Sequence, residues 1–208
     1  FCVRLSLSRR CVLVTGSELI QQCSHSRCRA GGALRTPLAE PLRILGIDPG
    51  SRLTGFGVLD CDGDSASYVA SGSVASADGA FPDRLRLIFS AISDIVAEYR
   101  PDVVAVESVF MHRNPSSALK LGHARSAAIC ATFQLDVDVH EYAPREIKQA
   151  IVGTGAATKE QIQHMVRQLL RLDGPPQADA ADALAAALCY VHRRQLKRRM
   201  HAAVAGLT

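Results

Sequence analysis

The chain has 208 residues, of which 48% are hydrophobic and 21% are charged, a balance that excludes intrinsic disorder and predicts one domain with a sizeable core. No apolar run approaches the roughly 20 residues of a membrane span, so we expect no membrane partner. The formal net charge of +4 lies entirely in residues 1–41, which hold six Arg against two Glu. Overall charge therefore does not identify a nucleic-acid partner, and any such site must be a local basic strip.

Residues 1–41 differ from the rest of the chain in composition. They are rich in Arg and Ser, poor in acidic residues and weakly periodic, and they contain four of the seven Cys. A transit peptide has such a composition; so does translated sequence upstream of the true start, which we favour because Cys-rich targeting peptides are unusual. Cys23, His25 and Cys28 fit no common zinc-finger spacing, and no second ligand pair follows them. We expect residues 1–41 to be a disordered extension or a mis-assigned start.

The segment 42–195 shows the periodicity of a folded domain. Three apolar runs separated by turn residues predict strands that pair antiparallel: 43–48, 54–59 and 68–74. Further along, residues 102–107 are almost all apolar, which is typical of a strand buried inside a sheet. A fifth strand is expected over 137–142.

Helices are predicted between and after these strands. Apolar residues recur at helical spacing from Leu85 to Tyr99, behind Pro82 and ahead of Pro101. Four further helical segments follow: 116–134, 144–152, 159–172 and 178–195. The order of elements predicts an α/β fold, a mixed five-stranded sheet flanked by helices.

Residues 196–208 are expected to form a basic C-terminal tail. Five basic side chains lie close together over residues 193–199. We interpret this run as the solvated end of the last helix, and contact with DNA is the alternative.

Four carboxylates occupy positions for which a purely structural account has little use. Asp48 and Glu107 each close an apolar strand, and Asp179 and Asp182 are spaced i, i+3 at the start of the last predicted helix. On a helix, the two Asp share one face, while the Leu and Val stripe that follows uses another. Small alanines flank the two Asp residues, so this helix face can approach the strand ends closely.

Converging carboxylates repel one another unless cations neutralise them. Oxygen donors without His or Cys partners favour Mg²⁺ or Mn²⁺, and two such ions can hold the attacking and leaving oxygens of phosphoryl transfer. Each residue also has a plainer interpretation: Asp48 before Pro-Gly as a turn former, and Asp179 or Asp182 as a helix cap. Spacing alone leaves both interpretations open.

Five blocks of sequence resemble the RuvC family of bacterial Holliday-junction resolvases. They occur in order and with family-like spacing between about residues 43 and 190, and the resemblance does not cover the N-terminal segment. The blocks are ILGIDPGSRLTGFGV (44–58), VESVFM (106–111), SALKLG (117–122), KEQIQHMV (159–166) and QADAADAL (177–184).

The resemblance implies an RNase H-like fold and a role for each matching residue. Asp48, Glu107, Asp179 and Asp182 would be the catalytic metal ligands, with two Mg²⁺ per subunit, or Mn²⁺ in their place. Lys148 and Lys159 match catalytic, DNA-binding lysines near the scissile backbone, and Phe110 matches an aromatic residue that stacks on a base at the junction point. Without the family match, the lysines would be ordinary helix-surface residues and Phe110 a loop anchor.

The resemblance also implies activity and partners. Members of the family are homodimers that nick two opposing strands of a four-way junction symmetrically, leaving 5′-phosphate and 3′-hydroxyl ends, in DNA recombination and repair. They act with the branch-migration helicase complex of RuvA and RuvB in the bacterial cytoplasm. The Ala-rich helix over 116–134 is the expected dimer seam, because small residues permit close helix approach; packing within one subunit is the alternative.

Three other functions compete with this hypothesis. An actin-like ATPase or sugar kinase also carries an Asp-Gly loop on its first hairpin, but its other nucleotide motifs are missing here, and the glycine-rich segment 153–159 lacks the Gly-Lys-Ser/Thr ending of a P-loop. A non-catalytic junction-binding scaffold is disfavoured because all four carboxylates are present. A nuclease with another DNA target is disfavoured by Phe110, since a simple-duplex nuclease needs no base-stacking residue.

Overall fold

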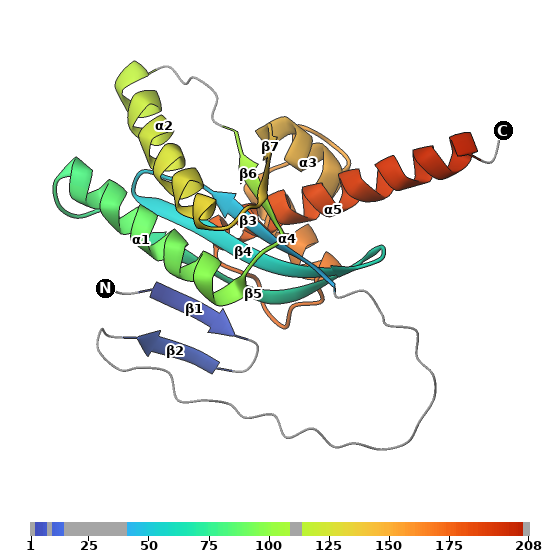
Figure 1. The fold of residues 1–208 in the computed structure, drawn as a ribbon, viewed down its shortest axis with the longest axis horizontal. Helices are drawn as coiled ribbons and strands as arrows, with labels where there is room; N and C mark the ends of the chain where they lie inside the picture. The colour runs from blue at the N-terminus through green and yellow to red at the C-terminus, as the bar shows by residue number, and fades with distance from the viewer. Residues whose placement is uncertain (1–2, 8–9, 15–40, 109–113, 206–208) are drawn as a thin grey trace.

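A computed structural model describes residues 3–7, 10–14, 41–108 and 114–205. Its centre is a mixed sheet in which β3 (Leu42–Asp48) pairs antiparallel with β4 (Leu53–Asp62), and β4 pairs antiparallel with β5 (Ser65–Ala75). On its other side β3 pairs parallel with β6 (Val103–Glu107), which pairs parallel with β7 (Asp138–Tyr142). The predicted five-stranded mixed sheet is therefore confirmed (Figure 1).

Two more strands extend this sheet. β1 (Val3–Leu7) pairs antiparallel with β5, and β2 (Arg10–Val14) pairs with β1, giving the strand order β2-β1-β5-β4-β3-β6-β7. This addition was not predicted from the sequence. The segment 15–40, with its Cys23, His25 and Cys28, lies outside the described residues, so the expectation of a disordered or mis-assigned N-terminal segment stays a prediction there.

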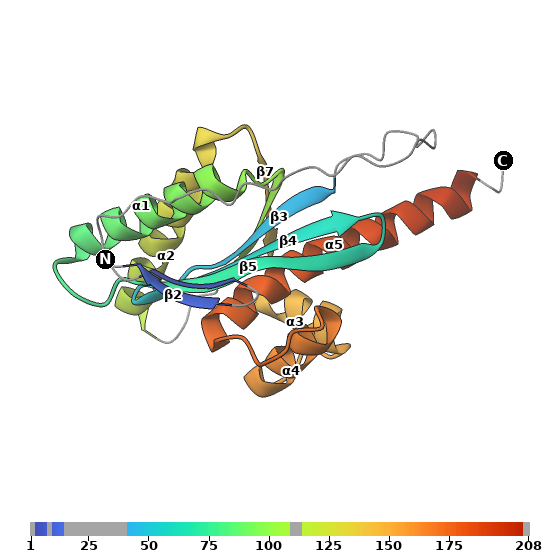
Figure 2. The same cartoon turned by 90° about the horizontal axis from the view of Figure 1, so that it is seen from below.

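Helices cover both faces of the sheet (Figure 2). One face carries α1 (Phe81–Tyr99), α2 (Pro115–Cys130) and the short 3₁₀ turn η1 (Ala131–Gln134). The other carries α3 (Pro144–Val152), α4 (Lys159–Leu169) and α5 (Ala178–Ala205). Two apolar cores result, one on each side, and the strands contribute alternate residues to them.

Local chemistry explains where several helices begin and end. Pro82 occupies the first turn of α1, and Arg100 ends that helix in the left-handed conformation. The Asn114 side chain accepts hydrogen bonds from the first backbone N–H groups of α2, and Thr158 with Gln161 forms a capping box at the start of α4.

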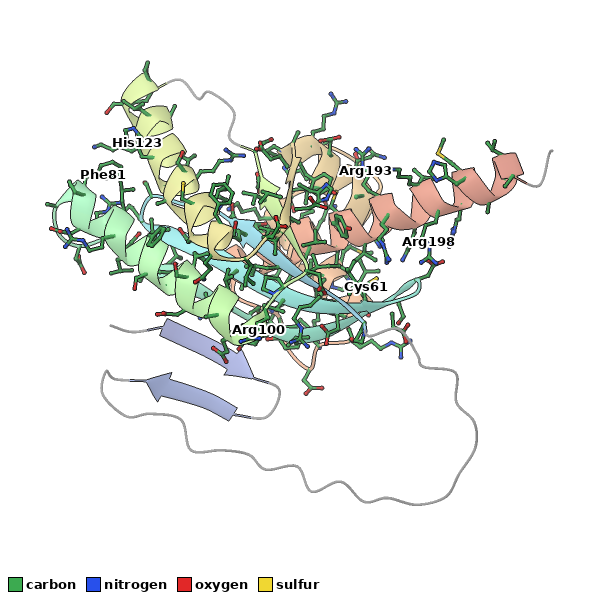
Figure 3. All side chains as sticks on the ribbon, in the orientation of Figure 1. Cys61, Phe81, Arg100, His123, Arg193 and Arg198 are labelled. Carbon is green, nitrogen blue, oxygen red and sulfur yellow. The ribbon has the colours of Figure 1, made fainter. Side chains whose placement is uncertain are left out.

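The last helix is longer than predicted. We expected it to end near residue 195, but α5 continues to Ala205 as one helix. Its C-terminal half crosses the β4–β5 hairpin, where the Gln195 side chain donates to the Asp64 carbonyl (2.7 Å) and Arg199 lies 3.4 Å from the Asp64 carboxylate. Figure 3 shows Arg198 on this projecting part of the helix. Residues 196–205 are exposed, so the basic run lies on a solvated end of the last helix as expected, and Arg199 in addition contacts the protein's own hairpin.

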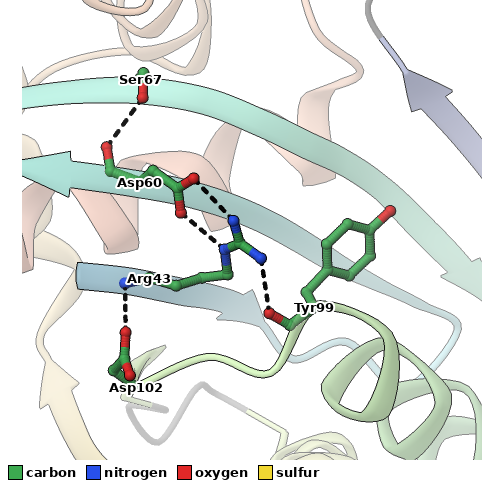
Figure 4. Close-up of polar contacts among 5 residues, drawn as sticks. All are labelled: Arg43, Asp60, Ser67, Tyr99 and Asp102. Carbon is green, nitrogen blue, oxygen red and sulfur yellow. Dashed lines mark hydrogen bonds and ion pairs between the residues drawn. The ribbon is translucent and has the colours of Figure 1, made fainter. Parts of the chain in front are cut away.

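Arg43 ties the start of the central strand to three neighbours (Figure 4). Its guanidinium makes two hydrogen bonds to the Asp60 carboxylate, at 2.8 and 2.9 Å, and donates to the Tyr99 carbonyl at 3.1 Å. Its backbone N–H donates to Asp102 at 2.7 Å. Arg43 thus connects β3 to β4, to the end of α1 and to the residues before β6.

No helix in the described part of the chain is both long enough and apolar enough to cross a membrane.

Candidate active site

Strand register brings Asp48 and Glu107 together. β3 and β6 pair in parallel with Ile47 opposite Val106, so the next residue on each strand, Asp48 and Glu107, ends neighbouring strands at the same edge. Two residues before each of them comes Gly46 or Ala105, on the sheet face that α5 covers. Because side chains alternate along a strand, both carboxylates project to the α5 side.

Three glycines let α5 lie directly on the sheet; we call Gly46, Gly55 and Gly57 the glycine seat. A Cβ atom at Gly55 would lie 2.0 Å from the Asp179 carbonyl oxygen, and one at Gly46 would lie 2.0 Å from the Ala183 carbonyl oxygen. At Gly57 the added atom would lie 2.6 Å from the Leu184 side chain. Only glycine permits so close an approach.

The glycine seat sets the height of the two helix carboxylates above the sheet. Gly55 pairs across the β3–β4 ladder with Asp48, and the backbone of Asp179 lies against Gly55. Asp182 is one helical turn further on, on the same face of α5 as Asp179. The structure therefore brings the four carboxylates that the sequence analysis singled out to one end of the sheet.

The electrostatics of the acids show that they share one environment. The pKa of Asp48 is raised to about 8, first by burial and then by the charges of Glu107, Asp182 and Asp179, in that order. The pKa of Glu107 is raised to about 7, first by burial and then by Asp182. Burial also raises the pKa of Asp182. Without a cation, the buried acids at this point therefore bind protons more readily than isolated carboxylates do.

Two basic side chains lie around the acids. The Lys159 ammonium, on the first residue of α4, is 3.4 Å from an Asp182 carboxylate oxygen, and its side chain is 74% exposed. Lys148, on α3, lowers the pKa of both Glu107 and Asp182 by its charge. Both lysines from the sequence analysis are therefore close to the carboxylates. Phe110 falls outside the described residues.

The donor set fits a hard divalent cation. All four candidate donors are carboxylates, whose oxygens Mg²⁺ and Mn²⁺ prefer. A cation would offset the loss of solvation and, secondly, the repulsion that raise the pKa values of Asp48 and Glu107. Among the described residues, no three acidic, His or Cys side chains already form a closed ligand set. Binding therefore requires the carboxylates to rotate toward a common point.

The loop after Asp48 is held by contacts that the sequence analysis missed. Thr54 hydrogen-bonds with the backbone of Gly50, and the Ser76 N–H donates to the Arg52 carbonyl at 2.8 Å. Arg84, on α1, donates to the carbonyls of Ser51 and Ser76. Nothing in the local pattern identifies Arg84. The glycine seat did leave a signal, because glycine inside an apolar strand indicates close backbone approach.

Comparisons with known proteins agree with this geometry. The family model described as "Crossover junction endodeoxyribonuclease RuvC" matches residues 44–190. The crossover junction endodeoxyribonuclease RuvC of Alkalilimnicola ehrlichii is 55% identical over 161 residues, which is 77% of this chain and 98% of that protein.

Solved structures give the same relationship. The Thermus thermophilus RuvC in complex with a Holliday junction substrate matches with a TM-score of 0.70 and 33% identity, over 75% of this chain and 96% of that chain. A yeast mitochondrial Holliday junction resolvase matches with a TM-score of 0.57 at 12% identity, over 78% of this chain and 85% of that chain, and shares the fold. The expected RNase H-like fold is confirmed by these matches, and the chain belongs to the RuvC family of crossover junction endodeoxyribonucleases, which are metal-dependent nucleases.

Proposed function

We propose that this protein resolves Holliday junctions by metal-dependent hydrolysis of one phosphodiester in each of two opposing strands, leaving 5′-phosphate and 3′-hydroxyl ends. The observation that carries the proposal is the convergence of strand-end and helix-start carboxylates at the edge of the sheet. Family membership supplies the substrate class.

In the proposed mechanism Asp48, Glu107, Asp179 and Asp182 hold two Mg²⁺ ions, for which Mn²⁺ can substitute. When bound, such ions lower the pKa of a water that attacks the scissile phosphorus and stabilise charge on the leaving 3′ oxygen. The carboxylates would orient the ions, and their partial burial fixes the backbone positions from which they do so.

The two lysines act on the DNA rather than on the acids alone. Lys159 is mostly exposed although its ammonium contacts Asp182, so a DNA phosphate at the surface can reach it. There it neutralises backbone charge next to the scissile bond, and Lys148 does the same from α3. Phe110, three residues after Glu107 in the sequence, stacks on a base that the junction exposes.

We also propose that the protein acts as a homodimer through α2. The outer face of this helix is open: Leu119 is 62% exposed, and a Cβ at Gly122 would meet no atom within 4 Å. A two-fold symmetric pair of sites matches symmetric nicking of two strands. By family, the partners are RuvA and RuvB, in the bacterial cytoplasm.

The test is cleavage of an end-labelled mobile four-way junction in Mg²⁺, compared with a linear duplex of the same sequence. The proposal predicts paired, symmetric nicks in the junction alone, which Asp48→Asn abolishes while junction binding persists. Equal cleavage of the linear duplex would show a nuclease with another target. Junction binding without cleavage by the unaltered protein would support a non-catalytic scaffold.

A further inference from the structure

The turn that leads into α5 decides where two of the proposed ligands lie. α5 begins at Ala178, directly before Asp179, and the preceding residues are Gly174, Pro175, Pro176 and Gln177. Proline has no backbone N–H and a fixed φ, so the Pro-Pro pair moves as a stiff unit and can be held only through its carbonyls or its ring. Any displacement of this turn is passed to Asp179 and Asp182.

One stripe of α4 contacts this turn and the segment before it. Lys159, Gln163 and Arg167 are spaced four residues apart, so they lie along one face of the helix; we call them the α4 stripe. Lys159 contacts the Asp182 carboxylate at 3.4 Å. Gln163 donates from its side-chain amide to the Pro176 carbonyl at 2.5 Å, and Arg167 donates to the carbonyls of Leu172 and Asp173 at 3.3 and 3.2 Å.

The neighbouring face of α4 is fixed independently of these polar contacts. Ile162 and Val166 are 3% and 0% exposed and lie in the core beneath α5. The helix cannot rotate about its axis without exposing Ile162 and Val166. The side chains of the α4 stripe are therefore held in fixed positions relative to the turn. The order of the contacts shows that the stripe lies alongside the chain into α5 and runs in the opposite direction.

The turn is also held from the sheet side. Ser73, on β5, donates to the Gln177 side-chain oxygen at 3.2 Å, and the Gln177 carbonyl accepts the first helical hydrogen bond, from Ala181, at 2.8 Å. The backbone of Asp179 rests on Gly55. The start of α5 thus lies between the sheet on one side and Gln163 on the other.

We propose that Gln163 is a positioning residue for the metal ligands Asp179 and Asp182, which it acts on through the Pro176 carbonyl, with Ser73 as its counterpart on the sheet. This inference rests on the ligand roles proposed above. Gln163 does not touch the reacting atoms. Gln163 fixes the turn before α5. The Asp179 and Asp182 carboxylates are therefore held close to the positions that they occupy when a cation is bound.

The test compares two substitutions on the same helix. Gln163→Met keeps the length and apolar stem of the side chain and removes only the amide donor. Gln168→Met makes the same change at an exposed position of α4, where the side chain has no hydrogen-bond partner among the described residues and the backbone carbonyl accepts from Arg171. Ser73→Ala removes the contact on the sheet side and is a small change that leaves the core intact, so it serves if Gln163→Met folds poorly.

The readout is Mn²⁺ affinity of the full-length, DNA-free protein, measured by calorimetry or by electron paramagnetic resonance of free Mn²⁺. We expect Gln163→Met to weaken Mn²⁺ binding on the order of 10-fold, the low end of the effect of groups that orient metal ligands. Ser73→Ala also weakens Mn²⁺ binding, and Gln168→Met leaves the Mn²⁺ affinity unchanged. In junction cleavage, Gln163→Met raises the Mg²⁺ concentration needed for half-maximal rate more than it lowers the rate at saturating Mg²⁺, while junction binding in EDTA is unaltered.

The Mn²⁺ affinities of Gln163→Met and Asp182→Asn together show which part of the inference fails. If Gln163→Met lowers the melting temperature but binds Mn²⁺ as well as the unaltered protein does, Gln163 has only a structural role and the inference is overturned. If Asp182→Asn also binds Mn²⁺ normally, the ligand assignment itself is wrong. A loss of affinity in Asp182→Asn together with an unchanged Gln163→Met refutes the positioning role alone.

Discussion

Replacing Gly55 by alanine is predicted to disable the site while leaving the fold in place. The added Cβ atom would lie 2.0 Å from the Asp179 carbonyl oxygen and 2.5 Å from its carbon, whereas ordinary contact begins at 3.4 Å. These obstructing atoms are backbone, which cannot rotate away as a side chain can. The first turn of α5 must therefore move off the sheet by about 1.4 Å, the difference between ordinary contact and 2.0 Å.

The displacement has a stability cost and a larger functional cost. Overpacking of this kind lowers the unfolding free energy by about 1–3 kcal/mol. We expect the protein to stay folded, because the buried residues of α5 still pack against the sheet. A shift of about 1 Å in catalytic groups reduces rate on the order of 100-fold. We therefore expect junction cleavage by Gly55→Ala to fall by that order, with junction binding in EDTA retained.

Gly57→Ala is the matched comparison on the same strand. Its Cβ would lie 2.6 and 2.7 Å from carbons of the Leu184 side chain and 3.0 Å from the Leu184 backbone nitrogen. The overlap with the backbone of α5 is therefore about 0.4 Å instead of about 1.4 Å, so the effect of Gly57→Ala on cleavage should be smaller than that of Gly55→Ala. Single-turnover cleavage and urea unfolding of the two variants provide the measurements. Equal cleavage rates for Gly55→Ala and the unaltered protein would refute the claim that the glycine seat sets the ligand positions.

Three further predictions follow from the electrostatics and the packing. Burial and neighbouring acids raise the pKa of Asp48 from 3.8 to about 8 and that of Glu107 from 4.5 to about 7. Between about pH 5 and 8 the folded state therefore holds protons that the unfolded state has released. Because of this difference, the unfolding free energy in EDTA should fall as the pH rises through that range. Urea titrations at several pH values check this, and a pH profile of the same slope in Asp48→Asn would contradict it. Arg43→Met should lower the unfolding free energy by about 1–2 kcal/mol, because it removes an ion pair that has two hydrogen bonds and is only partly exposed. Arg86→Met, at a side chain that is 81% exposed, should change the unfolding free energy little. Equal effects of the two substitutions would contradict a stabilising role of the Arg43–Asp60 pair. Lys159→Met should reduce the slope of log affinity against log salt for junction binding by about 1, and an unchanged slope would show that Lys159 does not contact phosphate.

The elements that the sequence predicted correctly are those whose signal is local. The apolar runs that end at Asp48 and Glu107, and the helical spacing behind Pro82, became β3, β6 and α1 within a few residues. The extent of α5 was underestimated because the apolar stripe ends near Val191. Beyond that point the helix makes contacts to Asp64 on a hairpin distant in sequence, which periodicity cannot reveal.

The N-terminal strands were missed for a related reason. Residues 3–7 alternate apolar and polar side chains, a strand pattern, but the composition of the whole segment suggested that it lies outside the fold. Their pairing depends on the free edge of β5, which is visible only once the sheet is assembled.

The candidate site was predicted as a set of residues but not as an arrangement. The sequence placed Asp48 and Glu107 each at the end of a strand, and the i, i+3 spacing placed Asp179 and Asp182 on one helix face; the parallel pairing that brings the two strand ends together came from the structure. What brings the two pairs together is the approach of α5 to Gly46 and Gly55, together with the side-chain contacts around Pro176. These are long-range contacts, and they leave only a faint trace in the local sequence.

The central claim is that the four carboxylates form one divalent-cation site. The most direct test is anomalous diffraction from crystals of the protein soaked in Mn²⁺, with Asp48→Asn crystals treated in the same way. The account predicts anomalous density bounded by Asp48, Glu107, Asp179 and Asp182 that is lost or much weakened in the variant. Mn²⁺ bound elsewhere, or density between the four residues that Asp48→Asn does not diminish, would contradict it.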